Sequence, residues 1–233
     1  MKNPKILVII PAFNEEANIK GVLSAIKTHL PQADTVVIND GSVDSTARIA
    51  EQAGVVVLNH PYNMGIGATM QTGYKYASRK GYDIAVQVDA DGQHPADQIE
   101  KIIEPVLKGR SDLVVGSRFL GTGDYRPSLA RGAGMAIFSG VVSAIIKERV
   151  TDTTSGFRAA GRRCIDFFAH HYPDDYPEVE ALVLLHKKGF SIMEVPVRMR
   201  ERGGGKSSIT PIRSVYYMVK VLLAIFVDLL KKV

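Results

Sequence analysis

The chain has 233 residues, of which 45% are hydrophobic and 23% are charged, the ordinary composition of a globular protein with a substantial core. Its one cysteine, Cys164, excludes an internal disulfide framework and indicates a reducing compartment. Residues 1–110 contain 11 Lys and Arg against 12 Asp and Glu, a net of −1, whereas residues 111–233 contain 18 against 12, a net of +6. The basic second half favours an anionic partner such as a phosphate or a lipid headgroup, although a solvated surface would have the same composition.

The N-terminal residues do not have the pattern of a secretory signal. Two lysines, Lys2 and Lys5, lead directly into the apolar run 6–10, which is too short for a signal core and is not followed by a small-residue cleavage site. Together with the single cysteine, this pattern predicts a cytoplasmic protein.

Short apolar runs, typical of buried strands, alternate with segments of helical periodicity in the first half. The helix after the first run is expected to be capped by Asn14, with Glu15 and Glu16 in its first turn. Buried strands separated by helices predict an α/β fold, in which a mostly parallel central sheet has helices on both faces. The expected strands are 5–10, 35–38, 55–58, 84–88 and 113–116, and the expected further helices are 44–53, 68–80 and a segment around 99–106.

Polar side chains follow four of the predicted strands, at the point where each strand ends. The carboxyl ends of parallel strands lie along one edge of the sheet, and ligands bind beyond that edge. Ordinary turn chemistry would explain any one of these segments alone, but the coincidence of four favours a ligand site. The segments are Phe13-Asn14-Glu15, Asn39-Asp40-Gly41-Ser42, Asp89-Ala90-Asp91 and Ser117-Arg118.

Asp89 and Asp91 are two positions apart at the end of an apolar strand, so their side chains can share a face. Two adjacent carboxylates repel each other unless a cation or a proton relieves them. Mg²⁺ or Mn²⁺ is commonly held by one or two carboxylates together with substrate phosphates. Gln93 offers a neutral oxygen ligand nearby, and His94 a softer one. The alternative is a purely structural turn, because Asp-rich turns follow many strands.

Two other nucleotide-binding folds are disfavoured. The dinucleotide fingerprint requires glycines directly after the first strand, where this chain has none, and the later Gly65-Ile-Gly67 has Met70 at the position of the third glycine. The chain also lacks the G-x-x-x-x-G-K-[ST] phosphate loop. A dehydrogenase or a P-loop nucleotidase is therefore not expected.

Five segments, taken in order, resemble the family 2 glycosyltransferases, and among them dolichyl-phosphate mannose synthase and the bacterial polyprenyl-phosphate hexosyltransferases. The resemblance extends over most of the chain and implies a single Rossmann-like GT-A domain at 1–209. Its nucleotide-sugar-binding half would be 1–117 and its acceptor half 118–209. The segments are Val8-Ile-Ile-Pro-Ala-Phe-Asn-Glu-Glu16, Ile38-Asn-Asp-Gly-Ser-Val-Asp-Ser-Thr46, Asn63-Met-Gly65, Asp89-Ala-Asp91 and Val115-Gly-Ser-Arg-Phe119.

The resemblance also implies the reaction: a metal-dependent, inverting transfer of a hexose from a GDP- or UDP-linked sugar to a polyprenyl phosphate. One departure from the family is Asn39, where a second Asp is frequent, and this weakens the inference on ribose contacts. The implied ligands of Mg²⁺ or Mn²⁺ are Asp89, Asp91 and Gln93, and the implied catalytic residues are Asp91, Arg118 and Arg131. The implied donor-binding residues are Pro11, Phe13, Glu15, Ile38, Asp40, Asn63, Asp89, Ala90 and Asp91, with Arg202 and Lys206 from a glycine-rich basic loop.

The acceptor side is expected in the basic second half, where the stretch 152–157 resembles one that lines the acceptor side in the family. A phosphate acceptor is already anionic and needs only positioning, whereas a sugar hydroxyl needs a carboxylate to take its proton. The basic half and the resemblance favour a phosphate. The acceptor-side candidates are Ser155, Arg158 and Glu178, and the candidate bases for a hydroxyl acceptor are Asp152, Glu178 and Glu180, of which the last two are equally well explained as acids at a helix start.

Two alternatives to a polyprenyl-phosphate transferase stay open. One is a glycosyltransferase that acts on the hydroxyl of a saccharide or lipid-linked saccharide, and the other is a non-catalytic scaffold that binds nucleotide sugars. Nucleic-acid binding is not expected, because the basic residues lack the aromatic platforms that bind single strands. Arg198 and Arg200 alternate with apolar residues along a predicted strand and should face solvent.

Residues 210–233 have the pattern of an amphipathic helix that starts at Thr210-Pro211. Lys220 and Asp228 interrupt its apolar stripe, so the helix is too short to span a membrane. It is expected either to lie on the cytoplasmic face of a membrane beside a lipid acceptor, or to pack on a second copy or on the domain core. The uncharged stretch 132–146 from Gly132 to Ile146 is expected to be a helix at the acceptor mouth or in the core.

Overall fold

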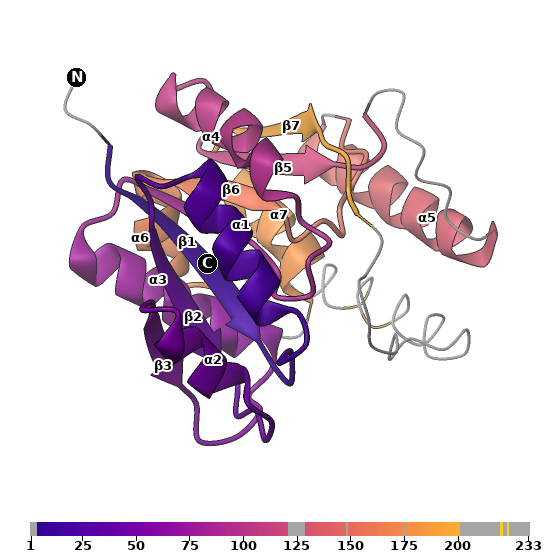
Figure 1. Ribbon diagram of the computed structural model, residues 1–233. Helices are drawn as coiled ribbons and strands as arrows, with labels where there is room; N and C mark the ends of the chain where they lie inside the picture. Colours follow the sequence, from indigo (N-terminus) through magenta and orange to yellow (C-terminus); the bar gives the residue numbers. More distant parts are fainter. Residues whose placement is uncertain are drawn as a thin grey trace.

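The computed structural model describes residues 4–120, 129–147, 149–174, 176–200, 220 and 223, with side chains in all of these except 129–135. Within them the chain forms a seven-stranded sheet in the order β3-β2-β1-β4-β6-β5-β7 (Figure 1). All neighbouring strands are parallel except that β6 is antiparallel to β4 and β5, which confirms the predicted mostly parallel sheet. The strands are β1 Ile6–Ala12, β2 Asp34–Asn39, β3 Val56–Asn59, β4 Ile84–Gln87, β5 Leu113–Ser117, β6 Arg158–Gly161 and β7 Ile192–Pro196.

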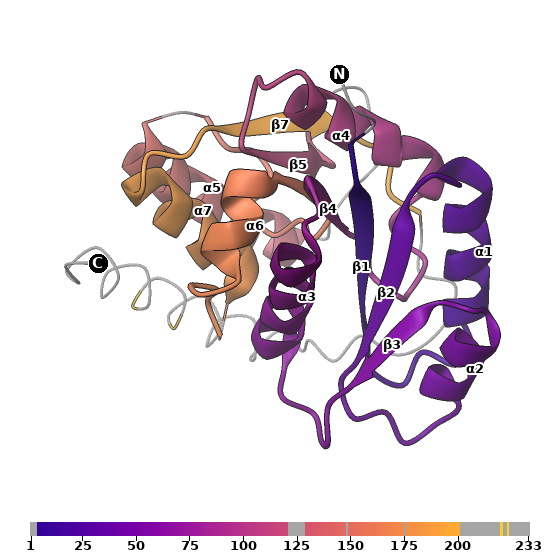
Figure 2. The ribbon, with the colours of Figure 1, turned by 90° about the vertical axis from the view of Figure 1, so that its left-hand side faces the viewer.

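Helices cover both faces of the sheet (Figure 2). One face packs against α1, α2 and α4, and the other against α3, α5, α6 and α7. Because α1 is amphipathic, its buried residues lie on a single stripe that faces the sheet. The helices are α1 Ile19–His29, α2 Thr46–Gln52, α3 Ile66–Lys80, α4 Ile99–Leu107, α5 Leu129–Ile146, α6 Arg162–Phe168 and α7 Pro177–Lys187, and a 3₁₀ turn, η1 Ala96–Gln98, precedes α4.

The first strand shows why the sheet is buried on both sides. All seven residues of β1 are buried, and alternate side chains enter different clusters. Leu7 and Ile9 join the cluster with α3, whereas Val8 and Ile10 join the cluster with α1. This division follows the two-residue period of a strand. A continuous apolar run is therefore the sequence pattern of a central parallel strand.

Several element boundaries differ from the sequence-based expectations. Asn14 was expected to cap the first helix, but it has a positive φ of 55° and α1 begins after Asn18. Its amide oxygen instead accepts a hydrogen bond from Val43 N at 2.9 Å, because the loop after β1 is bonded to the loop after β2. The acids Glu178 and Glu180 lie within the first turn of α7, which starts at Pro177 rather than after them.

The uncharged stretch 132–146 forms most of α5, as expected. Phe138, Val142 and Ile146 from this helix join the core cluster beneath the sheet. No helix in the described part of the chain is long and apolar enough to cross a membrane. The predicted C-terminal helix 210–233 lies outside the described residues, apart from Lys220 and Leu223, which are helical and exposed.

Candidate active site

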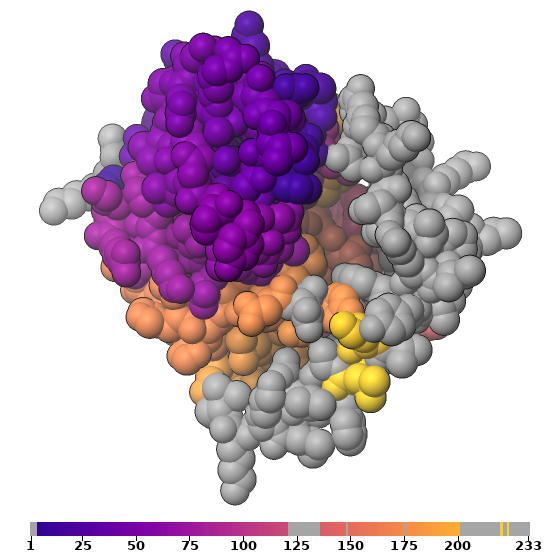
Figure 3. All heavy atoms as spheres, turned by 90° about the horizontal axis from the view of Figure 1, so that it is seen from below, coloured from indigo at the N-terminus to yellow at the C-terminus, as the bar shows by residue number. Residues whose placement is uncertain are grey.

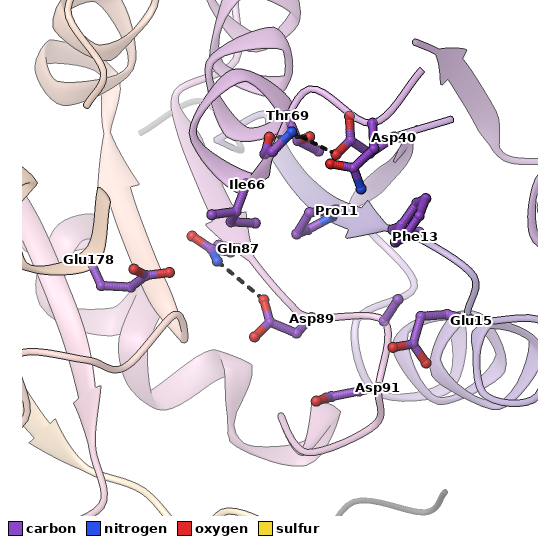
Figure 4. A pocket seen from close by; sticks show the side chains of 14 residues that line it. Pro11, Phe13, Glu15, Asp40, Ile66, Thr69, Gln87, Asp89, Asp91 and Glu178 are labelled. Atoms are coloured by element: carbon purple, nitrogen blue, oxygen red, sulfur yellow. Dashed lines mark hydrogen bonds between the residues drawn. The ribbon is translucent and has the colours of Figure 1, made fainter. Parts of the chain in front are cut away.

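A cavity of about 350 Å³ opens at the carboxyl ends of β1, β2 and β4. Figure 3 looks onto this end of the molecule, where a recess separates the indigo and purple N-terminal part from the orange segment of α6 and α7. The close view in Figure 4 shows that side chains from several segments converge there. The lining residues are Pro11, Ala12, Phe13, Glu15, Asp40, Asn63, Gly65, Ile66, Thr69, Gln87, Asp89, Ala90, Asp91 and Glu178.

The cavity brings together many residues that the sequence nominated, from five segments of the chain. Gln87 was not nominated, although it precedes Asp89 by two positions and so shares its face of the strand. Thr69 and Ile66 were also missed, because the sequence placed the start of α3 two residues too late. The nominated residues that line the cavity are Pro11, Phe13, Glu15, Asp40, Asn63, Asp89, Ala90, Asp91 and Glu178.

Other nominated residues lie elsewhere. Ile38 is fully buried, and its side chain belongs to the core. Gln93 does not line the cavity. The side chain of Arg131, on α5, lies outside the described residues, as do Arg202 and Lys206 entirely. The donor, metal or catalytic roles assigned to these five residues therefore stay predictions.

Asp89 is held in place by its neighbours on the strand and by His94. Its carboxylate accepts a hydrogen bond from Gln87 Nε2 at 3.2 Å, and its backbone N–H donates to His94 Nδ1 at 2.9 Å. Because Nδ1 accepts, a neutral His94 carries its proton on Nε2, which lies 3.6 Å from Asp89 Oδ2. His94 was considered as a soft metal ligand, but the ring is buried, stacks on Phe157 and supports the carboxylate.

Gly156 allows the chain to pass close to this carboxylate. A Cβ atom at position 156 would lie 2.8 Å from Gln87 Nε2 and 3.3 Å from Asp89 Oδ2. A larger residue would therefore displace the two side chains that define the centre of the cavity. The Gly in the segment Thr153-Thr-Ser-Gly-Phe157 has this steric reason, which is visible only in the folded chain.

The donor set at the cavity fits a hard divalent cation that shares its coordination with a substrate. Asp89 and Asp91 both line the cavity, and the Asp89 side chain is 38% exposed. Among the described residues there is no cluster of three or more His, Cys, Asp or Glu that could hold a metal by itself. Two carboxylates with open positions for phosphate oxygens are the arrangement that Mg²⁺ and Mn²⁺ commonly adopt.

The other end of the cavity is organised around Asp40. Its carboxylate accepts hydrogen bonds from Met64 N at 2.9 Å, Gly65 N at 3.0 Å and His60 Nδ1 at 2.8 Å. Asp40 thereby ties the end of β2 to the N-terminus of α3. Phe13, which is 45% exposed, lies at the same end of the cavity (Figure 4).

Reciprocal hydrogen bonds fix the loop that carries Phe13 and Glu15. Asn14 N donates to Ser42 Oγ at 3.0 Å, and Glu15 N donates to Thr46 Oγ1 at 2.8 Å. In return, Val43 N donates to the Asn14 side chain. The positive φ of Asn14 permits this exchange, and Asn is one of the residues that tolerate that conformation. The two polar segments after β1 and β2 therefore form one unit.

Arg118 and Asp152 form a buried ion pair beside the cavity. The Arg118 Nε and Nη2 atoms each lie 2.7 Å from a different oxygen of Asp152, and Arg118 N donates to the same carboxylate at 3.0 Å. Asp152 is almost fully buried, and its own N–H donates to Glu194. A carboxylate engaged in this way is not available as the general base considered from the sequence.

Ser155 and Arg158 are buried and bonded to backbone carbonyls. The Ser155 hydroxyl donates to Gly116 O at 2.7 Å, and the Arg158 guanidinium donates to the carbonyls of Ser155, Thr153 and Glu178. Through these bonds Arg158 holds the start of α7 against the segment before β6. Their acceptor-side roles stay predictions, because neither residue lines the cavity.

Glu178 enters the cavity from α7, on the side opposite Glu15 (Figure 4). Burial raises the pKa of its carboxyl above the ordinary value of 4.5, and the negative charge of Asp89 raises it further, against the opposing effect of Arg158. Of the three bases considered from the sequence, Glu178 is the one that lines the cavity. Glu180 is buried and Asp152 is ion-paired.

Comparison with known proteins identifies the family. The model of glycosyl transferase family 2 matches residues 7–172, well over half of the chain. The chain belongs to this family. The glycosyltransferase is 31% identical over 218 residues to "UDP-N-acetylglucosamine--dolichyl-phosphate N-acetylglucosaminyltransferase" of Methanococcus voltae, with 85% of this chain and 86% of the relative covered. It is 29% identical over 225 residues to "Polyprenol monophosphomannose synthase" of Mycolicibacterium smegmatis, with 91% and 84% covered.

A solved structure supports the fold of this glycosyltransferase. Glucosyl-3-phosphoglycerate synthase from Mycobacterium tuberculosis, crystallised with Mn²⁺, UDP and glucosyl-3-phosphoglycerate, superposes with a TM-score of 0.74. The match covers 97% of this chain and 80% of that one, at 21% identity. The family and the GT-A fold that the five motifs implied are thus confirmed, and the chain is a glycosyltransferase.

The raised pKa of Glu178 predicts a pH-dependent stability. The folded state binds the Glu178 proton more tightly than the unfolded chain does, so the ionised form destabilises the fold above pH 4.5. Glu178→Gln should raise the Tm at pH 8 by about 2 °C or more, and the gain should disappear at pH 4. Thermal unfolding across this range checks it, with the exposed Glu51→Gln as control. An equal shift at both pH values would contradict the assignment.

Proposed function

We propose that this glycosyltransferase transfers a hexose, with inversion, from a nucleotide-diphosphate sugar to a polyprenyl phosphate of the dolichyl or undecaprenyl type, and that it requires Mg²⁺ or Mn²⁺. The observation that carries the proposal is the pairing of Asp89 and Asp91 in one cavity with Asp40 at its other end. The printed activities of the two relatives, one acting on dolichyl phosphate and one on polyprenol, support the acceptor. The Mn²⁺ and UDP bound by the similar structure support the donor side.

The chain's residues divide the work along the cavity. Asp40, Phe13 and Pro11 would hold the nucleoside, and Asp89 and Asp91 would hold the cation beside the diphosphate. When bound, the cation neutralises the charge that develops on the leaving diphosphate. Gln87 and His94 keep Asp89 oriented for this role. Domain-level roles follow: 1–117 serves the donor, 118–209 the acceptor, and 210–233 contacts a membrane surface or a second copy.

Inversion follows from a direct displacement at the anomeric carbon. The acceptor oxygen attacks from the face opposite the leaving diphosphate, so one bond forms as the other breaks. A phosphate acceptor is anionic near neutral pH and requires orientation but no base. Arg118, whose guanidinium is fixed by Asp152 and is 18% exposed, is the described cation best placed for that task. Arg131, Arg202 and Lys206 are proposed to assist it.

Asp91→Ala should reduce turnover by about 100-fold or more while the fold remains intact, because one of two cation-holding carboxylates is lost. The measurement is release of nucleoside diphosphate from a set of GDP- and UDP-linked hexoses, with a short-chain prenyl phosphate and Mg²⁺ or Mn²⁺. Asp83→Ala is the matched control, since Asp83 is exposed at the opposite end of the same strand. Full activity of the Asp91 variant, or of wild type in chelator, would refute the metal role.

A hydroxyl acceptor is the second candidate, and the position of Glu178 favours it. A cavity-lining carboxyl with a raised pKa is suited to take a proton from a sugar hydroxyl. Under the phosphate proposal, Glu178→Gln should change kcat by only a few-fold, whereas a hydroxyl acceptor would require a loss of about 100-fold or more. The same turnover assay, with prenyl phosphate and with saccharide acceptors, separates the two. A steep loss with prenyl phosphate would contradict the leading proposal.

A further inference from the structure

The carboxylate of Asp40 has a restricted capacity to accept further hydrogen bonds. An ionised carboxylate offers about four acceptor positions, two on each oxygen. Oδ1 accepts from both His60 Nδ1 and Met64 N, and Oδ2 accepts from Gly65 N. Within the described residues, one position on Oδ2 is therefore left for a ligand in the cavity that Asp40 lines.

His60 fixes which oxygen stays open. Its ring is bonded on both sides, with Nδ1 2.8 Å from Asp40 Oδ1 and Nε2 3.0 Å from Thr72 Oγ1. The His60 side chain is 10% exposed and the Asp40 side chain 6%, so water does not compete freely for these bonds. His60 thus connects the end of β3 to α3 and prevents rotation of the carboxylate.

Nucleobases differ in how many donors they offer to a carboxylate. Uracil has one imide N–H between two carbonyls. Guanine has a ring N–H beside an amino group, and both oxygens of a carboxylate are needed to satisfy that pair. At this site Oδ1 is already saturated, so the second guanine donor would be buried without a partner, which weakens binding. The single open position on Asp40 therefore matches uracil.

Two neighbours complete a site for a planar base with carbonyl groups. Phe13 is half-exposed at the same end of the cavity and offers an aromatic face for stacking. Asn63 also lines the cavity, and its amide forms no hydrogen bond with the described residues. That amide can donate to a carbonyl beside the imide N–H.

We propose that the site selects a uracil nucleotide over a guanine nucleotide, because Asp40 has one open acceptor position, and that His60 is the positioning residue that fixes it. This inference rests on the proposed function, since it assumes that the cavity binds the nucleoside diphosphate of the donor. It narrows the donor to the uridine-diphosphate class. The sugar itself is read elsewhere in the cavity.

The test is calorimetric titration of the full chain, in Mn²⁺, with UDP, GDP, N3-methyl-UDP and inorganic pyrophosphate. UDP should bind at least about 10-fold more tightly than GDP, because the second guanine donor is unsatisfied. N3-methyl-UDP should lose about 10-fold relative to UDP, because the methyl group replaces the proton that Asp40 accepts. Pyrophosphate gives the affinity of the cation-binding end alone.

Variants of His60 separate positioning from general stability. His60→Phe should weaken UDP binding by about 10-fold and leave pyrophosphate binding unchanged, and His60→Asn, which retains a donor, should restore much of the affinity. His29→Phe, at the exposed end of α1, is the matched control. If the His60→Phe protein does not fold, the N3-methyl-UDP comparison on wild type still decides the question.

The outcomes distinguish this inference from the function on which it rests. GDP binding as tightly as UDP, or N3-methyl-UDP binding as tightly as UDP, would overturn uracil selection and leave the metal-dependent transfer intact. Failure of pyrophosphate and of both nucleoside diphosphates to bind in Mn²⁺ would contradict the proposed function, and the inference with it. Equal losses of UDP and pyrophosphate binding in His60→Phe would show a structural effect and refute the positioning role.

Discussion

The repulsion between two carboxylates at one strand end is the constraint on which the site depends. β4 ends at Gln87, and the turn that follows places both Asp89 and Asp91 at the cavity. Bringing like charges together destabilises a fold unless a cation or proton offsets them. The surroundings do not neutralise Asp89 with a lysine or arginine; they orient it with Gln87 and His94. That environment suits a cation which arrives with the substrate.

The rest of the cavity is held by hydrogen bonds between segments that are distant in sequence. Asn14 links the loops after β1 and β2, and Asp40 links β2 to α3. On the opposite side, Arg158 holds α7 through backbone carbonyls, and Arg118 is fixed by Asp152. Buried groups satisfied in this way are rigid, which preorganises a site for charged ligands. The sheet supplies the positions, and the loops supply the orientation.

The sequence predicted the sheet and the acidic part of the site because both depend on local patterns. Apolar runs followed by polar turns identified Asp40, Asp89 and Asp91 from the carboxyl ends of strands. It missed β6, whose residues Arg-Ala-Ala-Gly lack the β-branched side chains typical of strands. It also retained Asp152 as a base, because the pairing with Arg118, 34 residues away, is a tertiary contact. Contacts between distant segments leave no periodic signal.

The most direct measurement is a crystal structure of the full chain with Mn²⁺ and the nucleoside diphosphate that it binds, with the metal located by its anomalous signal. The account predicts a Mn²⁺ peak within coordination distance of a carboxylate oxygen of Asp89 or Asp91, with oxygens of both phosphates completing its coordination. A diphosphate and metal bound away from residues 89 and 91 would contradict it.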